Sequence, residues 1–123
     1  MTKGTGSTLY DLMTPALILN RTRLERNSRK MGERLNNLGV KLRPHLKTAK
    51  SSDVAKIATA GHSGGITVST MAEARYFAEN GFLDVIYAVA ITPSKLVSIC
   101  ALQREFGAQI TVLVDDLEVA KQI

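Results

Sequence analysis

The string Arg-Pro-His-Leu-Lys at residues 43–47 places three basic side chains at alternate positions. Alternate side chains of a β-strand share a face, so Arg43, His45 and Lys47 would lie opposite Leu42. In an α/β barrel the apolar face packs on the helices and the other face points to the interior, where reacting groups lie at the carboxyl ends of strands. A lysine amine in a partly dry pocket beside other cations loses its proton readily. Lys47 is therefore predicted to form an imine with an aldehyde.

The residues alone leave a second interpretation of this string open. Lys47 and Lys50 can equally be solvated loop lysines ahead of a helix, as most lysines of a basic protein are. Pro44 cannot donate to a strand ladder and is tolerated mainly at edges and bulges, so we expect a bulge here. Arg43, deeper on the same face, needs a partner such as a carboxylate from another strand, which predicts a structural role for it.

Helix and strand patterns alternate along the chain. Each helical pattern ends at a glycine, the residue best suited to the left-handed turn after a helix, and a β-rich run follows. These glycines are Gly39, Gly61, Gly81 and Gly107. Strands are predicted at residues 40–47, 65–69, 84–91 and 109–114, with an initial short strand at 16–19. Capping boxes at Thr22–Glu25 and Thr70–Glu73 predict two of the helix starts.

Strand-helix alternation forces parallel pairing through right-handed crossovers. The pattern suits two α/β architectures, a doubly wound open sheet and a (β/α)₈ barrel. A barrel needs about 250 residues, roughly double the length of this chain. The helical pattern at residues 117–123 has no glycine stop and no strand after it. We therefore expect the chain to be the N-terminal part of a longer protein.

The composition is that of an ordinary soluble globular protein, with 45% hydrophobic and 22% charged residues. No apolar run approaches the roughly 18 residues needed to span a bilayer, and the first twenty residues lack signal-peptide features. We expect a cytoplasmic protein with no membrane partner. The single cysteine, Cys100, lies in an apolar pattern and is interpreted as a core residue.

A net charge of +5 raises the question of nucleic-acid binding, because cations crowd the helical pattern after residue 20. The same pattern carries leucines at helical spacing, so the cations are better explained as its solvated face. The chain also has no Trp and only three Phe and three Tyr for base stacking. No nucleic-acid partner is predicted.

Four strings in order resemble one family. They are Thr14-Pro15-Ala16, Arg23-Leu24-Glu25-Arg26-Asn27, Leu42-Arg43-Pro44-His45-Leu46-Lys47-Thr48 and Gly65-Ile66-Thr67-Val68-Ser69-Thr70-Met71-Ala72-Glu73-Ala74. The sequence resembles the N-terminal part of the D-threonine aldolase and D-serine dehydratase group, fold-type III pyridoxal-phosphate enzymes with an alanine-racemase-like barrel. The resemblance implies parallel (β/α) repeats forming about half of a TIM-type barrel. Residues 21–123 would be the first half of that barrel, and residues 1–20 would carry a short strand that pairs with a C-terminal β-domain absent from this chain.

The resemblance also implies site residues. The lysine of the Arg-Pro-His-x-Lys-Thr string forms the internal aldimine with pyridoxal 5′-phosphate, which assigns that role to Lys47. His45 could lie beneath the cofactor, although a packed, hydrogen-bonded histidine is an equal alternative. Ser69 and Thr70 could help to hold the cofactor, although Thr70 is already explained as a helix cap. His62 falls at the opposite end of the barrel, where stability rather than catalysis is expected.

The activity that the resemblance implies is that of a lyase on D-3-hydroxy amino acids. An aldolase breaks the Cα–Cβ bond, whereas a dehydratase removes the Cα proton and then the β-hydroxyl. Family members carry a divalent metal on a C-terminal β-domain, so no metal ligand is predicted here, and the full-length form is expected to be a homodimer. The chain alone is expected to be inactive. The alternative is a non-catalytic half-barrel that binds a partner or self-associates through its sheet edges.

Overall fold

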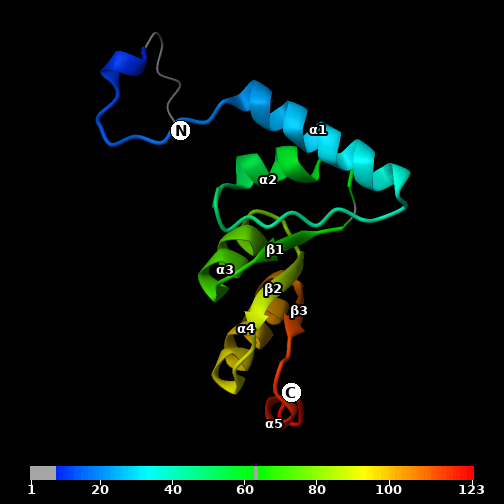
Figure 1. Cartoon of the computed structure of the whole chain (residues 1–123). Helices are drawn as coiled ribbons and strands as arrows, with labels where there is room; N and C mark the ends of the chain where they lie inside the picture. The colour runs from blue at the N-terminus through cyan, green and yellow to red at the C-terminus, as the bar shows by residue number, and fades with distance from the viewer. Residues whose placement is uncertain (1–7, 63) are drawn as a thin grey trace.

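Three parallel strands form the centre of the computed structural model, which describes residues 8–62 and 64–123. Strand β2 lies in the middle and pairs with β1 on one side and β3 on the other (Figure 1). The elements in chain order are η1 (Leu9–Asp11), α1 (Arg21–Asn37), α2 (Ser52–Thr59), β1 (Ile66–Val68), α3 (Met71–Glu79), β2 (Asp84–Ala90), η2 (Pro93–Lys95), α4 (Leu96–Phe106), β3 (Gln109–Leu113) and α5 (Leu117–Ala120). Strand-helix alternation and parallel pairing are confirmed.

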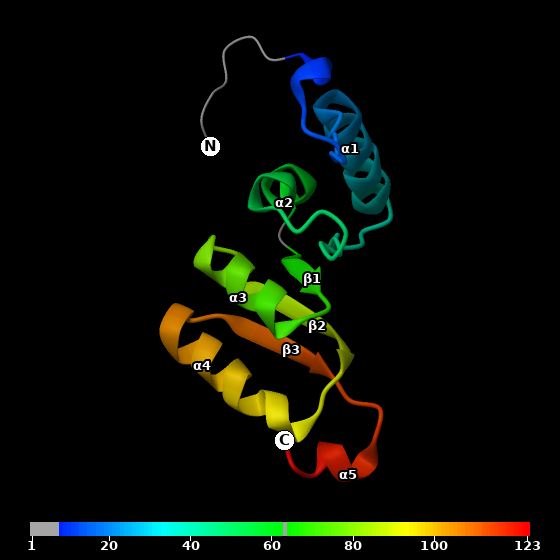
Figure 2. The ribbon, with the colours of Figure 1, turned by 90° about the vertical axis from the view of Figure 1, so that its left-hand side faces the viewer.

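Helices α3 and α4 cover one face of the sheet and leave the other face open (Figure 2). Alternate strand residues point into the helix-covered core because side chains of a strand alternate between faces. The core includes Leu46, Ile66, Val68, Phe77, Val85, Tyr87, Ile99 and Leu102, all buried. On the open face Thr67, Ile86 and Thr111 stand in register across the three strands. Cys100, predicted as a core residue, is exposed, because it is the neighbouring Ile99 that α4 turns toward the sheet.

The predicted strand at residues 40–47 is wrong, and the strand at residues 16–19, expected to pair with a further domain, stays a prediction. Residues 40–47 form no continuous strand but one parallel bridge, in which His45 pairs with Thr67. Pro44 has no N–H, and its carbonyl accepts from Thr67 at 2.9 Å, while a turn begins at Lys47. Residues 16–19 form no strand, and the side chains of residues 17–19 are exposed. A strand needs a partner for its backbone hydrogen bonds, and the described residues offer none there.

Local signals at the helix ends are mostly confirmed. All four predicted glycine stops have a positive φ, between 66° and 86°. Thr70 caps α3, where its Oγ1 accepts from the Glu73 N–H at 3.1 Å. The predicted cap at Thr22 is wrong: the cap lies two residues earlier, where Asn20 Oδ1 accepts from the Arg23 N–H at 2.9 Å. Asparagine is at least as good an N-cap as threonine, and it precedes Thr22 in the chain.

Helix α1 packs against α2 beyond the β1 edge of the sheet (Figures 1 and 2). As predicted, its cations form an exposed face, and Arg21 and Arg29 pair with Glu25 and Glu33 one turn on. In the described part of the chain, no helix has both the length and the apolar character needed to cross a bilayer. The cationic helix is therefore an outer, solvated layer of the fold.

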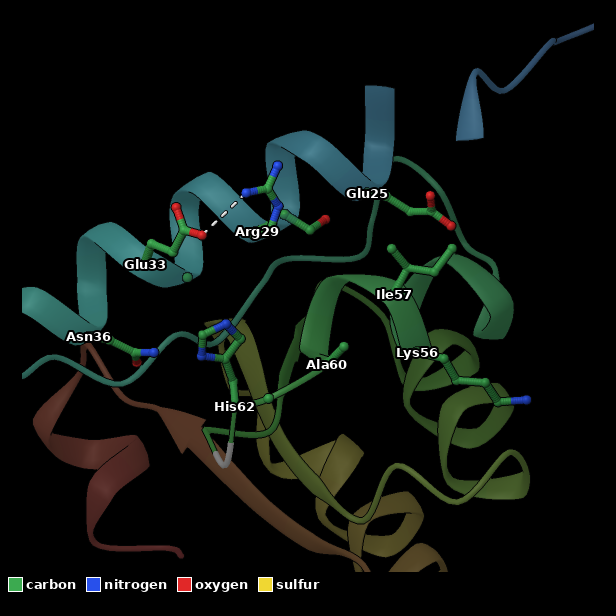
Figure 3. A pocket seen from close by; sticks show the side chains of 11 residues that line it. Glu25, Arg29, Glu33, Asn36, Lys56, Ile57, Ala60 and His62 are labelled. Atoms are coloured by element: carbon green, nitrogen blue, oxygen red, sulfur yellow. Dashed lines mark hydrogen bonds and ion pairs between the residues drawn. The ribbon is translucent and has the colours of Figure 1, made fainter. Parts of the chain in front are cut away.

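His62, in the loop after α2, packs against α1 (Figure 3). Its imidazole ring lies on Gly32, the one buried residue of α1: a Cβ at position 32 would overlap Nε2 and lie 2.6 Å from Cε1. Gly32 is therefore present for close packing, although glycine weakens a helix interior by about 0.5–1 kcal/mol relative to alanine. This contact agrees with the predicted structural role of His62.

We expect Gly32→Ala to destabilise the wild-type chain but to stabilise a chain that carries His62→Ala. In the wild-type chain the new methyl group meets the ring, and the free energy of unfolding should fall by about 1 kcal/mol or more. With His62→Ala the obstruction is gone, and the same substitution should raise that energy by about 0.5–1 kcal/mol through helix propensity. Urea unfolding of the four chains of this double-mutant cycle measures both effects. Equal effects in the two backgrounds would contradict the contact.

Candidate active site

Lys47 lies two residues after the bridge to β1 and is the first residue of a tight turn. The Lys50 N–H donates to the Leu46 carbonyl at 2.9 Å and closes this turn. Leu46 is buried in the core, whereas His45 and Lys47 on either side of it are exposed. The alternation places both basic side chains toward the open face of the sheet, as the sequence predicts.

His45 ties the site lysine's backbone to the end of β1. Its Nδ1 accepts from the Lys47 N–H at 3.2 Å, and its Nε2 lies 3.1 Å from Ser69 Oγ. Because Nδ1 is an acceptor, the neutral ring carries its proton on Nε2 and donates to the serine hydroxyl. The structure thus brings together three predicted site residues, His45, Lys47 and Ser69.

The fourth predicted residue, Thr70, is committed to capping α3. Its neighbour Ser69 donates its backbone N–H to Glu73 Oε2 at 2.8 Å, so the reciprocal bond of the expected capping box comes from Ser69 and not from Thr70. The roles of His45, Ser69 and Thr70 toward a cofactor stay predictions.

Lys47 and Lys50 differ in their electrostatic surroundings. Lys50 Nζ lies 3.4 Å from Oε1 of Glu73, a carboxylate that is only 7% exposed. Among residues 8–62 and 64–123, no carboxylate lies within 4.0 Å of Lys47 Nζ. To attack an aldehyde, Lys50 Nζ would have to leave this ion pair, whereas Lys47 Nζ would not. Of the two lysines, Lys47 is the one whose amine is uncommitted.

The amino-terminal end of the same sheet face holds the predicted partner of Arg43. Its guanidinium binds Asp84 of β2 through two bonds of 2.8 Å, a bidentate pair. Gly65 lies beneath the pair: a Cβ there would lie 2.7 Å from Asp84 Cγ and overlap the guanidinium. Gly65, in a segment that matches no phosphate-binding pattern, thus has a packing role. The carboxylate partner that was predicted for Arg43 on another strand is thus found in Asp84.

The expected partly dry pocket around Lys47 is not formed by the described residues, because the sheet face that bears it is uncovered. A cavity of about 560 Å³ lies elsewhere, between α1 and α2, and is lined by residues such as Arg29, Gly32 and His62 (Figure 3). None of the four predicted site residues lines it. This groove belongs to the packing of the two helices and not to the lysine site.

The resemblance implies two bound groups, pyridoxal phosphate and a divalent metal. The residues around Lys47 fit only the first. An uncommitted amine beside a fixed histidine and a serine suits covalent capture of an aldehyde such as pyridoxal phosphate. Three or more His, Cys, Asp or Glu side chains placed to hold a metal ion do not occur in the described ranges. The described residues therefore do not fit a divalent metal.

Comparison with known proteins identifies the fold. Residues 19–123 match the family described as alanine racemase, N-terminal domain. The chain belongs to this family. Its three parallel strands and covering helices are accordingly part of the barrel of that domain, which confirms the predicted fold class.

Curated relatives in the same family catalyse two kinds of reaction. The chain is 40% identical over 94% of its length to D-threo-3-hydroxyaspartate dehydratase of Delftia sp. (strain HT23). It is 38% identical over 88% of its length to 3-hydroxy-D-aspartate aldolase of Paracoccus denitrificans, and 32% identical over 94% to D-serine dehydratase of Dictyostelium discoideum. It spans about 30% of the length of these relatives.

Solved structures of such enzymes superpose closely. The Delftia dehydratase matches with a TM-score of 0.88 at 40% identity, over 94% of this chain and 30% of that one. D-threonine aldolase from Filomicrobium marinum matches with a TM-score of 0.82 at 30% identity, over 93% and 31%. The described backbone thus follows the alanine racemase N-terminal fold along nearly its whole length.

Sequence reasoning missed the second contact of Glu73. The capping pattern Thr70–Glu73 was sufficient to explain this glutamate locally, within the first turn of α3. Its pairing with Lys50 joins residues far apart in the chain. No local pattern in the sequence indicates this pairing, because it depends on how the Lys50 segment and α3 pack against each other.

Proposed function

We propose that this chain is the cofactor-anchoring part of a pyridoxal-phosphate-dependent lyase acting on D-3-hydroxy amino acids, with Lys47 as the covalent anchor. The observation that carries the proposal is the difference between the two lysines: Lys50 is paired with Glu73, and Lys47 has no carboxylate partner among the described residues. The relatives, a dehydratase of D-threo-3-hydroxyaspartate and an aldolase of 3-hydroxy-D-aspartate, support this substrate class.

The residues of this chain divide the work between them. When bound, pyridoxal phosphate supplies an electron sink for charge released at the substrate α-carbon. Lys47 would hold the cofactor through its aldehyde group, and its free amine would serve as a base toward the substrate. His45 holds the Lys47 backbone through Nδ1 and is itself held by Ser69, so the amine starts from a fixed turn.

Borohydride trapping tests the anchor. The chain is incubated with substoichiometric pyridoxal phosphate, reduced with sodium borohydride and digested, and the labelled peptides are quantified by mass spectrometry. We expect most of the label on Lys47. Lys30 and Lys41, which are exposed and form no ion pair with the described residues, report the background labelling of surface lysines. A label on Lys47 no greater than on these two would refute the anchor.

The reaction type is tested with the substrates that the relatives suggest. D-threo-3-hydroxyaspartate and D-serine yield ammonia and an oxo acid if water is eliminated, whereas retro-aldol cleavage of D-threonine yields glycine and acetaldehyde. A protein that carries this chain together with the remaining length of its relatives should give one of these product pairs. The 123-residue chain alone should capture the cofactor without turnover, because its lysine site lies on an uncovered face.

Self-association is a second candidate function, favoured by the open sheet face. Ile86 on that face is only half-buried, and Leu113 and Val114 at the β3 end are 48% and 42% exposed. Apolar surface and an unpaired strand edge favour pairing with another chain. Sedimentation of the 123-residue chain across a concentration series tests this: a dimer supports it, and a monomer at all concentrations rules it out.

A further inference from the structure

A closed ring of contacts surrounds the turn that carries Lys47. The Lys47 N–H donates to His45 Nδ1 at 3.2 Å, and His45 Nε2 lies 3.1 Å from Ser69 Oγ. The Ser69 N–H donates to Glu73 Oε2 at 2.8 Å, and Glu73 Oε1 lies 3.4 Å from Lys50 Nζ. The Lys50 N–H returns to the Leu46 carbonyl at 2.9 Å. One end of the turn is thus held through Ser69, just after β1, and the other through Glu73, in the first turn of α3.

Glu73 is the centre of this ring. It is the one buried charged residue in the part of the chain that the structure describes, with 7% of its surface exposed. A buried carboxylate is costly unless it is paired and hydrogen-bonded. Its two oxygens have different partners, the Ser69 N–H and Lys50 Nζ, and its place in the first turn of α3 favours negative charge. Helix capping alone does not require a buried side chain with a lysine partner.

Lys50 has a left-handed backbone conformation, which the ring of contacts stabilises. Its φ is +45°, and it is the one residue other than glycine with a positive φ among the described residues. This left-handed conformation is unfavourable for a residue with a Cβ, and it persists only where the surroundings hold it. Lys50 is held at both ends, by its N–H on Leu46 and by its amine on Glu73.

We propose that Glu73 and Lys50 are positioning residues for Lys47. The ring that they close fixes the turn so that the Lys47 amine stays on the open sheet face, and the ion pair withholds the amine of Lys50 from the same aldehyde. The inference rests on the proposed function, because it assigns the two residues their purpose through Lys47. It adds to that function an explanation of why Lys47, and not Lys50, reacts with the aldehyde.

The first test compares lysine reactivity without any cofactor. Glu73→Gln keeps an oxygen for the Ser69 N–H but removes the charge that holds Lys50. Glu79→Gln is the matched control, because Glu79 is an exposed glutamate of the same helix that pairs with Arg75. Each chain is treated briefly with acetic anhydride, and the acetylation of each lysine is measured by mass spectrometry. We expect acetylation of Lys50 to rise about 2- to 5-fold in Glu73→Gln, the size of one released ion pair, and to stay unchanged in the control.

The second test follows the label of pyridoxal phosphate after borohydride reduction. In Glu73→Gln the share of label on Lys50 should rise at the expense of Lys47. Lys50→Met opens the ring at the other partner and leaves Glu73 with the Ser69 N–H. It should speed amide hydrogen exchange at the Lys50 N–H and lower the trapped fraction on Lys47. Lys50→Arg keeps the ion pair and should restore both to wild-type values, a rescue that a general loss of stability would not show.

The outcomes separate this inference from the proposed function. If Lys47 carries the label but Lys50 acetylation and the label ratio are the same in Glu73→Gln as in wild type, the positioning role is wrong and the anchor stands. If wild-type Lys47 takes no label above background, the proposed function fails, and the purpose assigned to the ring fails with it. A raised Lys50 reactivity together with a shifted label supports both.

Discussion

Lys47→Arg is expected to remove both the visible cofactor absorbance and the borohydride-stable adduct. Arginine keeps the positive charge of the site but cannot form an imine, so the substitution tests covalent chemistry and not electrostatics. In a lyase that contains this chain, kcat should fall by at least about 10²- to 10⁴-fold, the usual effect of losing a group that transfers a proton in the transition state. Absorbance spectra, adduct mapping and product formation measure the three effects.

Lys50→Arg is the matched control for that substitution. It changes the neighbouring lysine in the same way while preserving the pair with Glu73. The spectrum and the adduct on Lys47 should survive it. An adduct that persists in Lys47→Arg and disappears in Lys50→Arg would exchange the roles of the two residues and contradict the site described above.

Gly65→Ala is expected to lower the free energy of unfolding by about 3 kcal/mol or more. Two independent costs add at this position. The backbone is left-handed, with φ at +71°, and a Cβ would overlap the Asp84 carbonyl oxygen and the Arg43 guanidinium. The methyl group would therefore push apart the pair that ties the residue 43 segment to β2 across β1. Equilibrium urea unfolding measures the loss.

Gly81→Ala isolates the backbone part of this cost. Gly81 has a similar φ of +86°, but no atom lies within 4 Å of the place where its Cβ would be. We expect it to lose only the conformational term of about 1–2 kcal/mol. If Gly65→Ala costs no more than Gly81→Ala, the close approach of Arg43 and Asp84 over Gly65 has no energetic importance.

Features that depend on neighbours in the chain were predictable from the sequence. Glycine stops and the Thr70 cap are decided within a few residues, because φ preferences and orphan N–H groups are local properties. The parallel sheet also follows from local patterns, since helix crossovers between buried strands permit few other arrangements. The need of Arg43 for a carboxylate was predictable, because a cation on an inward face is seldom left without a partner.

Features that depend on the partner of a segment were decided by the tertiary structure. Whether residues 40–47 form a strand depends on which backbone groups stand opposite them, and Pro44 together with the turn at Lys47 limits the pairing to one bridge. That Asp84 is the partner of Arg43 depends on strand register across Gly65. The distinction between Lys47 and Lys50 depends on Glu73, which lies more than twenty residues further along. The sequence by itself determined which residue types could do chemistry, and only the packing of distant segments decided which amine is left uncommitted, because Coulombic and hydrogen-bond partners are set by distance in space.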